Sequence, residues 1–469
     1  IFSGLVKPDE KFNILPDLAY KWETSNDGLK WRFYLREGVK FHNNIELTAE
    51  DVKFTYDLIK NPGHRGYYTQ FFEPINKINI IDRHTIEIVL NQPYTPLLSG
   101  LTVGILPKHI YEGRNLRDLE VNKQPVGTGP FKVLNYSSSK AVLTANKDYF
   151  NGRSYLDKII FRIFKNQDTL FAKMMDETVD VIYDSNPENI DILKQVTYFK
   201  HYKFLRPFYY ILAFQNKGIL KDKRVRTALN YAVNKKQLLK NVLKNDGKVA
   251  FGTVYPGSWA YSKKIGPYPY NPRKALKLLS EAGWKDTNDN HILDKDGVEL
   301  GFTVLFLEEF AVEEESLKHI QVDLNNIGVS MKANKYSIER FNEFLMRRKF
   351  DAILIDLVSR GDPDNSYKFW HSSQIEKGRN FFSYKNEKID KLLEEGRRVS
   401  DIDLRKKLYY QFQEEIFNDP PGIFLFWTNH LIMVHERFKG VKMHPSWVLD
   451  LKDWYVPEGS HQRTEDRER

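Results

Sequence analysis

The sequence contains no cysteine among its 469 residues. Disulfide bonds, thiol catalysis and cysteine-ligated zinc are therefore excluded. It also lacks any apolar run near the roughly 18 residues that a membrane-spanning helix needs. The two strongest apolar runs, at 423–427 and 352–358, are short, and Asp356 interrupts the second. These runs predict buried strands.

Motifs of common enzyme and metal sites are missing as well. There is no G-x-S-x-G elbow and no H-E-x-x-H pair. The stretch 127–130, G-T-G-P, is not a phosphate loop, because no Gly-Lys-Ser/Thr follows it and Pro130 has no amide donor. The polar stretch 286–297 has His291 and Gly297 where a calcium-binding EF-hand needs Gly and Glu, so polar hairpin turns explain it better. We predict no enzymatic activity, no metal and no cofactor.

Charge of one sign is not concentrated in any block. Lys and Arg number 71 against 62 Asp and Glu, for a net charge of +9, and the two signs are interleaved along the chain. Such a pattern indicates a solvated surface rather than an arm that binds RNA or DNA. We therefore expect no nucleic-acid partner. The acidic run 313–315 predicts a solvated helix face in the same way.

What the sequence does contain is an alternation of strand and helix patterns. Apolar residues recur at every second position in 31–35, 86–90 and 302–306, which is typical of strands. Apolar residues at helical spacing follow Thr48 and Asp51, a pair that resembles a capping box, and follow Asn271-Pro272, which is typical of a helix N-terminus. A further helical stripe at 320–327 ends at Gly328. The alternation predicts an α/β architecture. No linker or repeat divides the chain, so any lobes are expected to be built from discontinuous pieces.

The order of residues between Leu18 and Ile59 is more specific than its periodicity. W-E-x-S-x-D-G, F-x-L-R-x-G-V-K-F-H and L-T-A-x-D-V follow one another there. Further motifs are P-V-G-T-G-P-F at 125–131, D-x-R-V-R-x-A-L-x-x-A at 222–232 and D-P-D-N at 362–365. Over roughly residues 4–445, the chain resembles extracellular solute-binding protein family 5. Its members are periplasmic receptors for dipeptides, oligopeptides and some other solutes, and they supply ABC importers.

The resemblance implies an α/β fold of the two-lobed periplasmic-binding-protein type II kind, a clamp with an extra subdomain in the first lobe. The first lobe would comprise 1–213 and 432–457, with the extra subdomain at about 18–150, and the second lobe would comprise 214–431. Hinge strands are expected near 209–215 and 424–430, and a disordered tail at 458–469. Relatives usually carry a further strand ahead of 4–6, so we expect the mature N-terminus to be missing from this sequence.

The loop 359–363 is the expected place of the ligand, because it follows an apolar strand and ligands gather at the carboxyl ends of strands. The resemblance implies more. In dipeptide and oligopeptide receptors, an Asp three residues before this D-P binds the α-ammonium group of the ligand. Here that position is Ser359, so a buried ammonium would lose its countercharge. Arg360 could instead favour an anionic group; the alternatives are that it points to solvent or pairs with Asp362 or Asp364.

Other candidates could complete the site. Aromatic side chains offer rigid area and a polar handle to a ligand, although core packing is the competing interpretation for each. Asn380 could supply an amide contact or stabilise its own turn. His371 is also considered as a possible contact, because some relatives bind nickel complexes. The predicted ligand-binding residues are Ser359, Arg360, Gly361, Trp427, Tyr209, Tyr210, Trp370 and Asn380.

The resulting hypothesis is a solute-binding receptor that delivers a peptide or peptide-like small molecule to an ABC transporter by hinge closure. Its partners would be the ligand and a permease in the membrane, and the protein is expected to be a monomer. It would be periplasmic or extracellular, with a lipid anchor upstream of Ile1 left open. The alternatives are a receptor for a nickel chelate, opine or oligosaccharide, a hydrolase on the same scaffold, and a chaperone-like or adhesive protein that grips extended segments of other chains.

Overall fold

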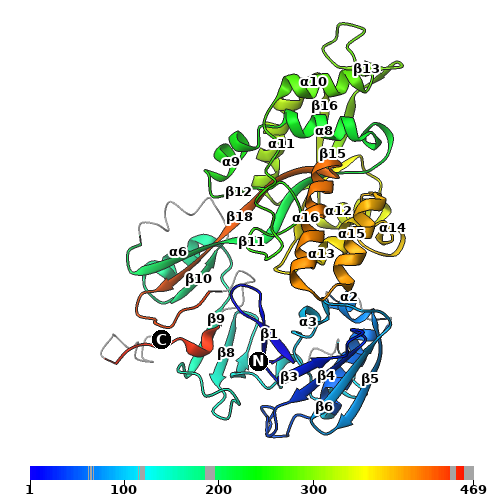
Figure 1. The fold of residues 1–469 in the computed structure, drawn as a ribbon. Coiled ribbons are helices and arrows are strands. Elements are labelled where there is room, and N and C mark those ends of the chain that lie inside the picture. Colours follow the sequence, from blue (N-terminus) through cyan, green and yellow to red (C-terminus); the bar gives the residue numbers. More distant parts are fainter. Residues whose placement is uncertain are drawn as a thin grey trace. The chain divides into compact units, whose positions relative to one another are not determined.

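The fold is described from a computed structural model of the chain. The structure describes residues 1–458 except 62, 64–65, 67, 115, 117–121, 185–195 and 444–449. All but the first residue of the expected tail, 458–469, thus lies outside the described residues. The chain forms two compact units, whose elements are labelled in Figure 1. Unit 1 holds the described parts of 1–202 and 431–458, and unit 2 those of 203–430.

Two long strands, β11 (Phe199–Phe214) and β18 (Gly422–His435), run from one unit into the other. The lobe boundaries predicted at 213/214 and 431/432 lie within the same two strands as the observed divisions. The functional lobe boundaries stay a prediction.

The first sheet of unit 1 is antiparallel, in the order β3 (Ala19–Thr24), β4 (Lys30–Leu35), β6 (Thr85–Leu90) and β5 (Ile75–Asp82). Phe33 lies opposite Ile86, and both side chains are buried. The alternation at 31–35 and 86–90 therefore marks one buried sheet face, as predicted.

Helix α1 (Ala49–Lys60) covers part of this core with Val52, Tyr56 and Ile59. The Asp51 carboxylate accepts hydrogen bonds from the backbone amide of Thr48 at 2.9 Å and from that of Lys108 at 2.9 Å. A carboxylate in the first turn also complements the positive end of the helix dipole. The predicted helix start at Thr48 is confirmed.

The other elements of unit 1 are short. They are β1 (Val6–Pro8), β2 (Ile14–Pro16), α2 (Thr69–Phe72), α3 (Leu97–Gly100), α4 (Lys108–Tyr111), β7 (Phe131–Tyr136), β8 (Lys140–Ala145), β9 (Lys158–Arg162), α6 (Gln167–Met175), β10 (Val181–Asp184) and the 3-10 turn η3 (Leu451–Asp453). Strands β7, β8 and β9 form an antiparallel sheet, and β10 pairs with the last residues of β18.

Unit 2 is built on a mixed sheet, in the order β18, β11, β17 (Ala352–Val358), β15 (Gly301–Leu307) and β16 (Ser330–Tyr336), with β12 (Gly247–Val249) beside β18. Strand β15 is parallel to both β16 and β17, whereas β11 is antiparallel to β17. The apolar runs at 352–358 and 423–427 are central strands here, as predicted from their length and composition.

Helices pack on both faces of this sheet. Leu212, Phe214, Val304 and Leu354 join one apolar core with residues of α8, α10 and α11, whereas Tyr209 contacts Trp370 of α13 on the opposite face. The helices of unit 2 are α8 (Lys223–Ala232), α9 (Lys235–Leu243), α10 (Pro272–Glu281), α11 (Ala311–Asn325), α12 (Ile338–Arg347), α13 (Asn365–Trp370), α14 (Gln374–Lys377), α15 (Glu387–Arg398), α16 (Ile402–Asn418) and the 3-10 turn η2 (Gly218–Lys221).

The helix boundaries follow from local chemistry. The Asn271 side chain accepts a hydrogen bond from the Lys274 amide at 3.0 Å, and Pro272 occupies the first turn of α10. Helix α11 ends at Asn325, so Ile327 of the predicted stripe lies just beyond it, and Gly328 has a φ of +74°. The stretch 286–297 contains β13 (Asp294–Lys295) and the turn that joins it to β14 (Val298–Glu299), in line with the predicted polar turns.

Candidate ligand-binding site

The three parallel strands of unit 2 end at the same edge of the sheet. Because β15 is parallel to β16 and to β17, the carboxyl ends at Leu307, Tyr336 and Val358 lie along one edge. The loop 359–364 leaves this edge directly after β17. The structure therefore puts the predicted loop where open α/β sheets gather their ligands.

Ser359 forms hydrogen bonds with other residues of unit 2. Its amide donates to the carbonyl of Pro207 at 2.8 Å, and its hydroxyl accepts from the Tyr255 amide at 3.2 Å. Two positions further on, the Gly361 carbonyl accepts a hydrogen bond from the Ser258 hydroxyl. Ser359 and Gly361 are both buried in the unit. Their contacts fix the loop backbone, and their roles as ligand contacts stay predictions.

Two arginines hold the acidic residues of the loop. Arg405 of α16 contacts Asp362 with both terminal nitrogens, at 2.8 and 2.9 Å, and donates to the Gly396 carbonyl at 2.7 Å. Arg397 of α15 contacts Asp364 at 2.8 and 3.2 Å. Burial opposes the charge of Arg405, but the attraction of Asp362 leaves the pKa of this guanidinium above its ordinary value. Such bidentate pairs fix geometry as well as charge.

Arg360 lies in the chain between Ser359 and Gly361, whose contacts are described above, and it is half-buried. Asp362 and Asp364, its predicted alternative partners, each already accept two hydrogen bonds from another guanidinium. Their negative charge is therefore largely compensated without Arg360. Its role as an anion-binding residue stays a prediction.

The predicted aromatic residues separate onto the two sheet faces. On one face, the Trp370 indole donates to the Tyr209 hydroxyl at 3.3 Å, and the rings of Tyr209 and Trp427 lie 5.3 Å apart. These three side chains are at most 1% exposed within unit 2. Tyr210 lies on the other face, 5.1 Å from the ring of Phe426. The structure thus brings three candidates together in a packed cluster and separates the fourth from them.

The amide group of Asn380 is hydrogen-bonded to its own turn and to the end of α13. Its nitrogen donates to the carbonyls of His371 and Tyr384, at 3.2 and 2.8 Å, and its oxygen accepts from the Tyr384 amide at 3.1 Å. Of the two alternatives for Asn380, the structure favours turn stabilisation. His371 is buried, and its ring nitrogens lie 2.7 Å from the Ser373 hydroxyl and 3.3 Å from Glu394.

Two carboxyl groups near the loop were not predicted as site residues. Glu313, expected on a solvated helix face, is only 4% exposed and accepts a hydrogen bond from the Leu307 amide at 3.2 Å. That expectation was wrong, because the first turn of α11 directs Glu313 toward the end of β15. Burial raises the pKa of Glu313 to about 8, and burial also raises the pKa of Asp356 on β17. For Asp356, the clue in the sequence was the presence of a charged residue inside the apolar run 352–358.

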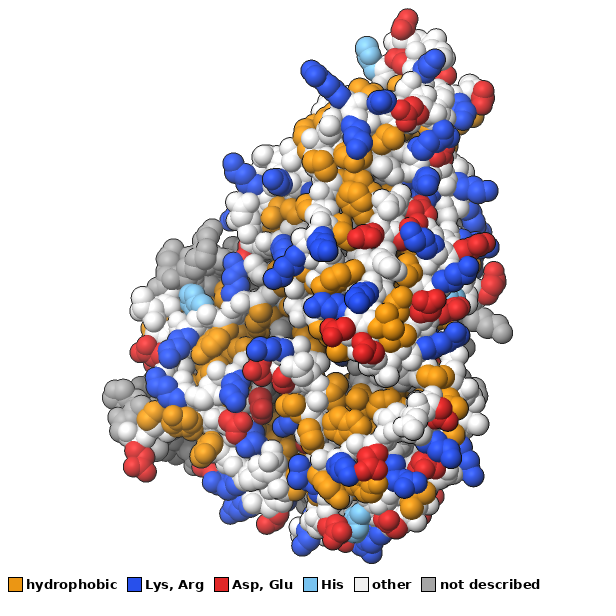
Figure 2. All heavy atoms as spheres, in the orientation of Figure 1, with side chains coloured by type: hydrophobic (Ala, Val, Ile, Leu, Met, Phe, Trp, Pro, Cys, Tyr) orange, Lys and Arg blue, Asp and Glu red, His pale blue; other side chains and the backbone are white. Residues whose placement is uncertain are grey.

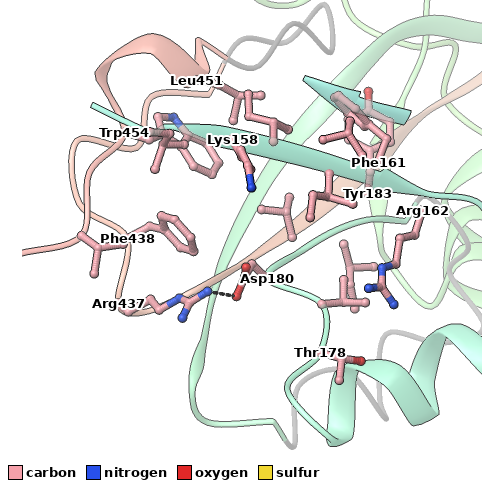
Figure 3. Close-up of a pocket in the computed structure, with 18 of the residues that line it drawn as sticks. Lys158, Phe161, Arg162, Thr178, Asp180, Tyr183, Arg437, Phe438, Leu451 and Trp454 are labelled. Atoms are coloured by element: carbon pink, nitrogen blue, oxygen red, sulfur yellow. Dashed lines mark hydrogen bonds and ion pairs between the residues drawn. The ribbon is translucent and has the colours of Figure 1, made fainter. Parts of the chain in front are cut away.

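A pocket within unit 1 has a volume of about 2030 Å³ (Figure 3). Strands β9 and β10 contribute Phe161 and Tyr183, which are 49% and 44% exposed, and the C-terminal segment contributes Phe438 and Trp454. Arg437 and Asp180 form an ion pair at its wall, at 2.6 Å. None of the predicted ligand-binding residues lines this pocket, so the candidate site is built on the loop of unit 2.

Neither the charges visible in Figure 2 nor the arrangement of possible metal ligands among the described residues indicates another site. On the face drawn in Figure 2, basic and acidic side chains are interspersed, which agrees with the solvated surface inferred from the sequence. Among the residues that the structure describes, no three His, Asp or Glu side chains gather closely enough to hold a metal ion. The prediction that the protein binds no metal stays a prediction.

Comparison with known proteins identifies the family. Residues 13–378 match the bacterial extracellular solute-binding proteins, family 5 Middle. The chain is 33% identical over 479 residues to the oligopeptide-binding protein AppA of Bacillus subtilis (strain 168), covering 97% of this chain and 86% of AppA.

Solved structures agree with this match. The structure of NikZ from Campylobacter jejuni in complex with Ni(L-His) has a TM-score of 0.84 and 30% identity, covering 97% of this chain and 94% of NikZ. The structure of AppA from Bacillus subtilis in complex with a nonapeptide has a TM-score of 0.82 and 31% identity, covering 98% of this chain and 93% of AppA. Within the described part of the chain, no helix is long and apolar enough to cross a membrane. The chain belongs to the bacterial extracellular solute-binding proteins of family 5 and has their α/β, two-lobed clamp fold.

Proposed function

We propose that this protein is the receptor of an ABC importer and that its solute is a peptide or peptide-like molecule. The observation that carries the proposal is the loop 359–364. It stands at the carboxyl edge of the parallel strands, and Arg397 and Arg405 each hold it through two hydrogen bonds. A preorganised loop loses little conformational freedom when it binds a ligand. The family match and the likeness to AppA, whose name is oligopeptide-binding protein, favour a peptide.

The proposed mechanism involves binding and closure without covalent chemistry. Closure would bend β11 and β18, the strands that connect the two units, and it would be a population shift driven by the ligand. The closed form would dock on a membrane permease from the periplasmic or extracellular side. A monomer that binds no nucleic acid is part of the same proposal.

A metal chelate is the second candidate solute. The reason is specific: NikZ, whose structure contains Ni(L-His), is 30% identical to this chain with a TM-score of 0.84. His371 is buried and already contacts Ser373 and Glu394, so it would need to exchange these contacts to reach a metal.

Native mass spectrometry of the purified protein tests the proposal. The spectrum is recorded before and after unfolding and refolding, so that the refolded protein serves as the ligand-free reference. A bound mass that is lost on refolding and fragments as a peptide supports the proposal. Where the purified protein is empty, refolded protein is screened by thermal shift against mixed peptides and against Ni²⁺ with L-histidine. Stabilisation by the nickel complex alone selects the second candidate, and stabilisation by neither overturns both.

A further inference from the structure

A pocket within unit 2 lies away from the loop 359–364. It has a volume of about 700 Å³ and is lined by residues of the segments 216–226 and 375–385, together with Arg348 and Asp419. The first of these segments begins just after Phe214, which pairs with Ala352 at the start of β17. The loop 359–364 follows the other end of β17, so the pocket and the candidate ligand-binding site lie toward opposite ends of this strand.

Basic side chains predominate in the lining of this pocket. The six basic residues are Lys217, Lys221, Lys223, Arg226, Arg348 and Lys385, and the two acidic residues are Glu376 and Asp419. All four lysines are exposed. Within the described part of the chain, none of these lysines forms an ion pair within 4.0 Å. Their charges are therefore available to a ligand that enters the pocket.

The nearest carboxylates are already compensated by other residues. One carboxylate oxygen of Asp419 accepts a hydrogen bond from Arg226, and the other accepts from the Asn386 side chain at 2.9 Å. Asp222, which separates two of the lysines in the chain, accepts from the Arg224 guanidinium at 2.6 Å and from the Arg224 amide at the start of α8. Carboxylates held in this way do little to neutralise the lysines.

Arg348 adds a further positive charge to the wall of the pocket. Its side chain is half-buried, and a terminal nitrogen donates to the carbonyl of Ile375, which is a neutral acceptor. No ion pair within 4.0 Å involves Arg348 among the described residues. Glu376, the other acidic residue of the lining, is exposed and cannot balance Arg348 together with four lysines. The pocket therefore keeps a surplus of positive charge, which favours an anion with more than one negative charge.

We propose that this pocket binds a phosphate-bearing anion, at a site separate from that of the solute. Lysine and arginine are the side chains that bind phosphate oxygens, and a volume of about 700 Å³ is in the range of sites for small molecules. The phosphate belongs either to a soluble phosphate ester or to the headgroup of an anionic phospholipid, which would hold the protein at a membrane surface. A solvated basic surface without a ligand is the competing interpretation.

The test uses the full-length protein and defined phosphate probes. Inorganic phosphate and glycerol phosphate are titrated by calorimetry at a constant ionic strength set with sodium chloride, and vesicles of phosphatidylglycerol are compared with vesicles of phosphatidylcholine by co-sedimentation. At least one phosphate probe is expected to bind the wild-type protein saturably. Binding of glycerol phosphate selects the soluble source, and binding of phosphatidylglycerol vesicles alone selects the headgroup. The double variant Lys221→Gln with Lys385→Gln should weaken this binding by about tenfold or more, the scale of a hydrogen bond to a charged group.

The matched control is the double variant Lys236→Gln with Lys240→Gln. Both residues are exposed on α9 of the same unit and do not line the pocket, so this variant loses the same charge elsewhere. It should bind the probe like the wild type, and urea unfolding should show equal stability of both double variants. Equal losses of binding in the two would overturn the inference, because the binding would then follow net charge alone. Unchanged binding in the pocket variant, or saturable binding of no probe, overturns it as well. The proposed solute receptor rests on the loop 359–364 and stands in either case.

Discussion

Arg405 and Asp362 form a bidentate ion pair across 43 residues of sequence, with nitrogen–oxygen distances of 2.8 and 2.9 Å. The side chain of Arg405 is 4% exposed and that of Asp362 is 20% exposed. The pair joins α16 to the loop that follows β17. Arg397 and Asp364 join α15 to the same loop, so two helices determine its position.

Replacing Arg405 by Met should destabilise the protein by about 3 kcal/mol, since the change leaves Asp362 mostly buried without its partner. Urea unfolding monitored by tryptophan fluorescence measures the change. The double variant Arg405→Met with Asp362→Leu should recover most of the loss, because it removes both charges. A double variant as unstable as the single one would show that the pair contributes packing rather than charge compensation.

Arg405→Lys separates position from charge. Lysine keeps the charge but cannot form the two parallel hydrogen bonds, so the loop should lose its fixed geometry and the affinity for the solute should fall. Arg226→Lys is the control, because Arg226 is a buried arginine of the same unit that contacts Asp419 outside the loop. The variants are compared by isothermal titration and by urea unfolding. Equal losses of affinity in both variants would mean that affinity only follows stability.

Arg360→Ala should weaken solute binding by about 1.5–3 kcal/mol if Arg360 binds an acidic group, which is the scale of a charged hydrogen bond. Isothermal titration with the solute recovered from the purified protein measures the change. Arg379→Ala is a suitable control, because Arg379 is exposed and lies outside the loop in the same unit. An affinity equal to that of the wild type would remove Arg360 from the site.

Much of the fold was predictable from local patterns. The strand periods at 31–35 and 302–306 and the start of α1 at Thr48 correspond directly to observed elements. These features depend on neighbouring residues, which the sequence displays side by side. The loop at 359–363 was predicted because an apolar strand precedes it and the D-P motif identifies it.

The contacts of the site were less predictable because they join distant residues. Nothing local indicates that Arg405 pairs with Asp362 or that the Asn380 amide reaches the His371 carbonyl. Glu313 was misassigned for the opposite reason: three consecutive glutamates suggest a solvated surface, yet a helix turns each of them in a different direction. Only tertiary structure brings Glu313 to the end of β15.

Lys235 should make stability rise with pH in the alkaline range. Its side chain is buried, donates to Asn230 at 3.0 Å, and lies 5.2 Å from the centre of the Tyr268 ring. Burial lowers its pKa from 10.5 to about 7. Between these values the unfolded chain binds a proton that the native protein does not, so stability increases with pH, by up to about 1.4 kcal/mol per unit. Lys235→Met should remove this slope in urea unfolding, and an unchanged slope would contradict the assignment.

Glu313 should have the opposite effect over a more acidic range. Burial, opposed by the Leu307 amide and reinforced by Asp356, raises its pKa from 4.5 to about 8. Between about pH 4.5 and 8 the native protein retains a proton that the unfolded chain has lost, so stability falls as pH rises, by up to about 1.4 kcal/mol per unit. Urea unfolding of Glu313→Gln should lack this fall, because glutamine imitates the protonated acid at every pH. The exposed neighbour Glu315 supplies the control, since Glu315→Gln should leave the pH profile of the wild type unchanged. A fall of the same size in Glu313→Gln would assign it to another group.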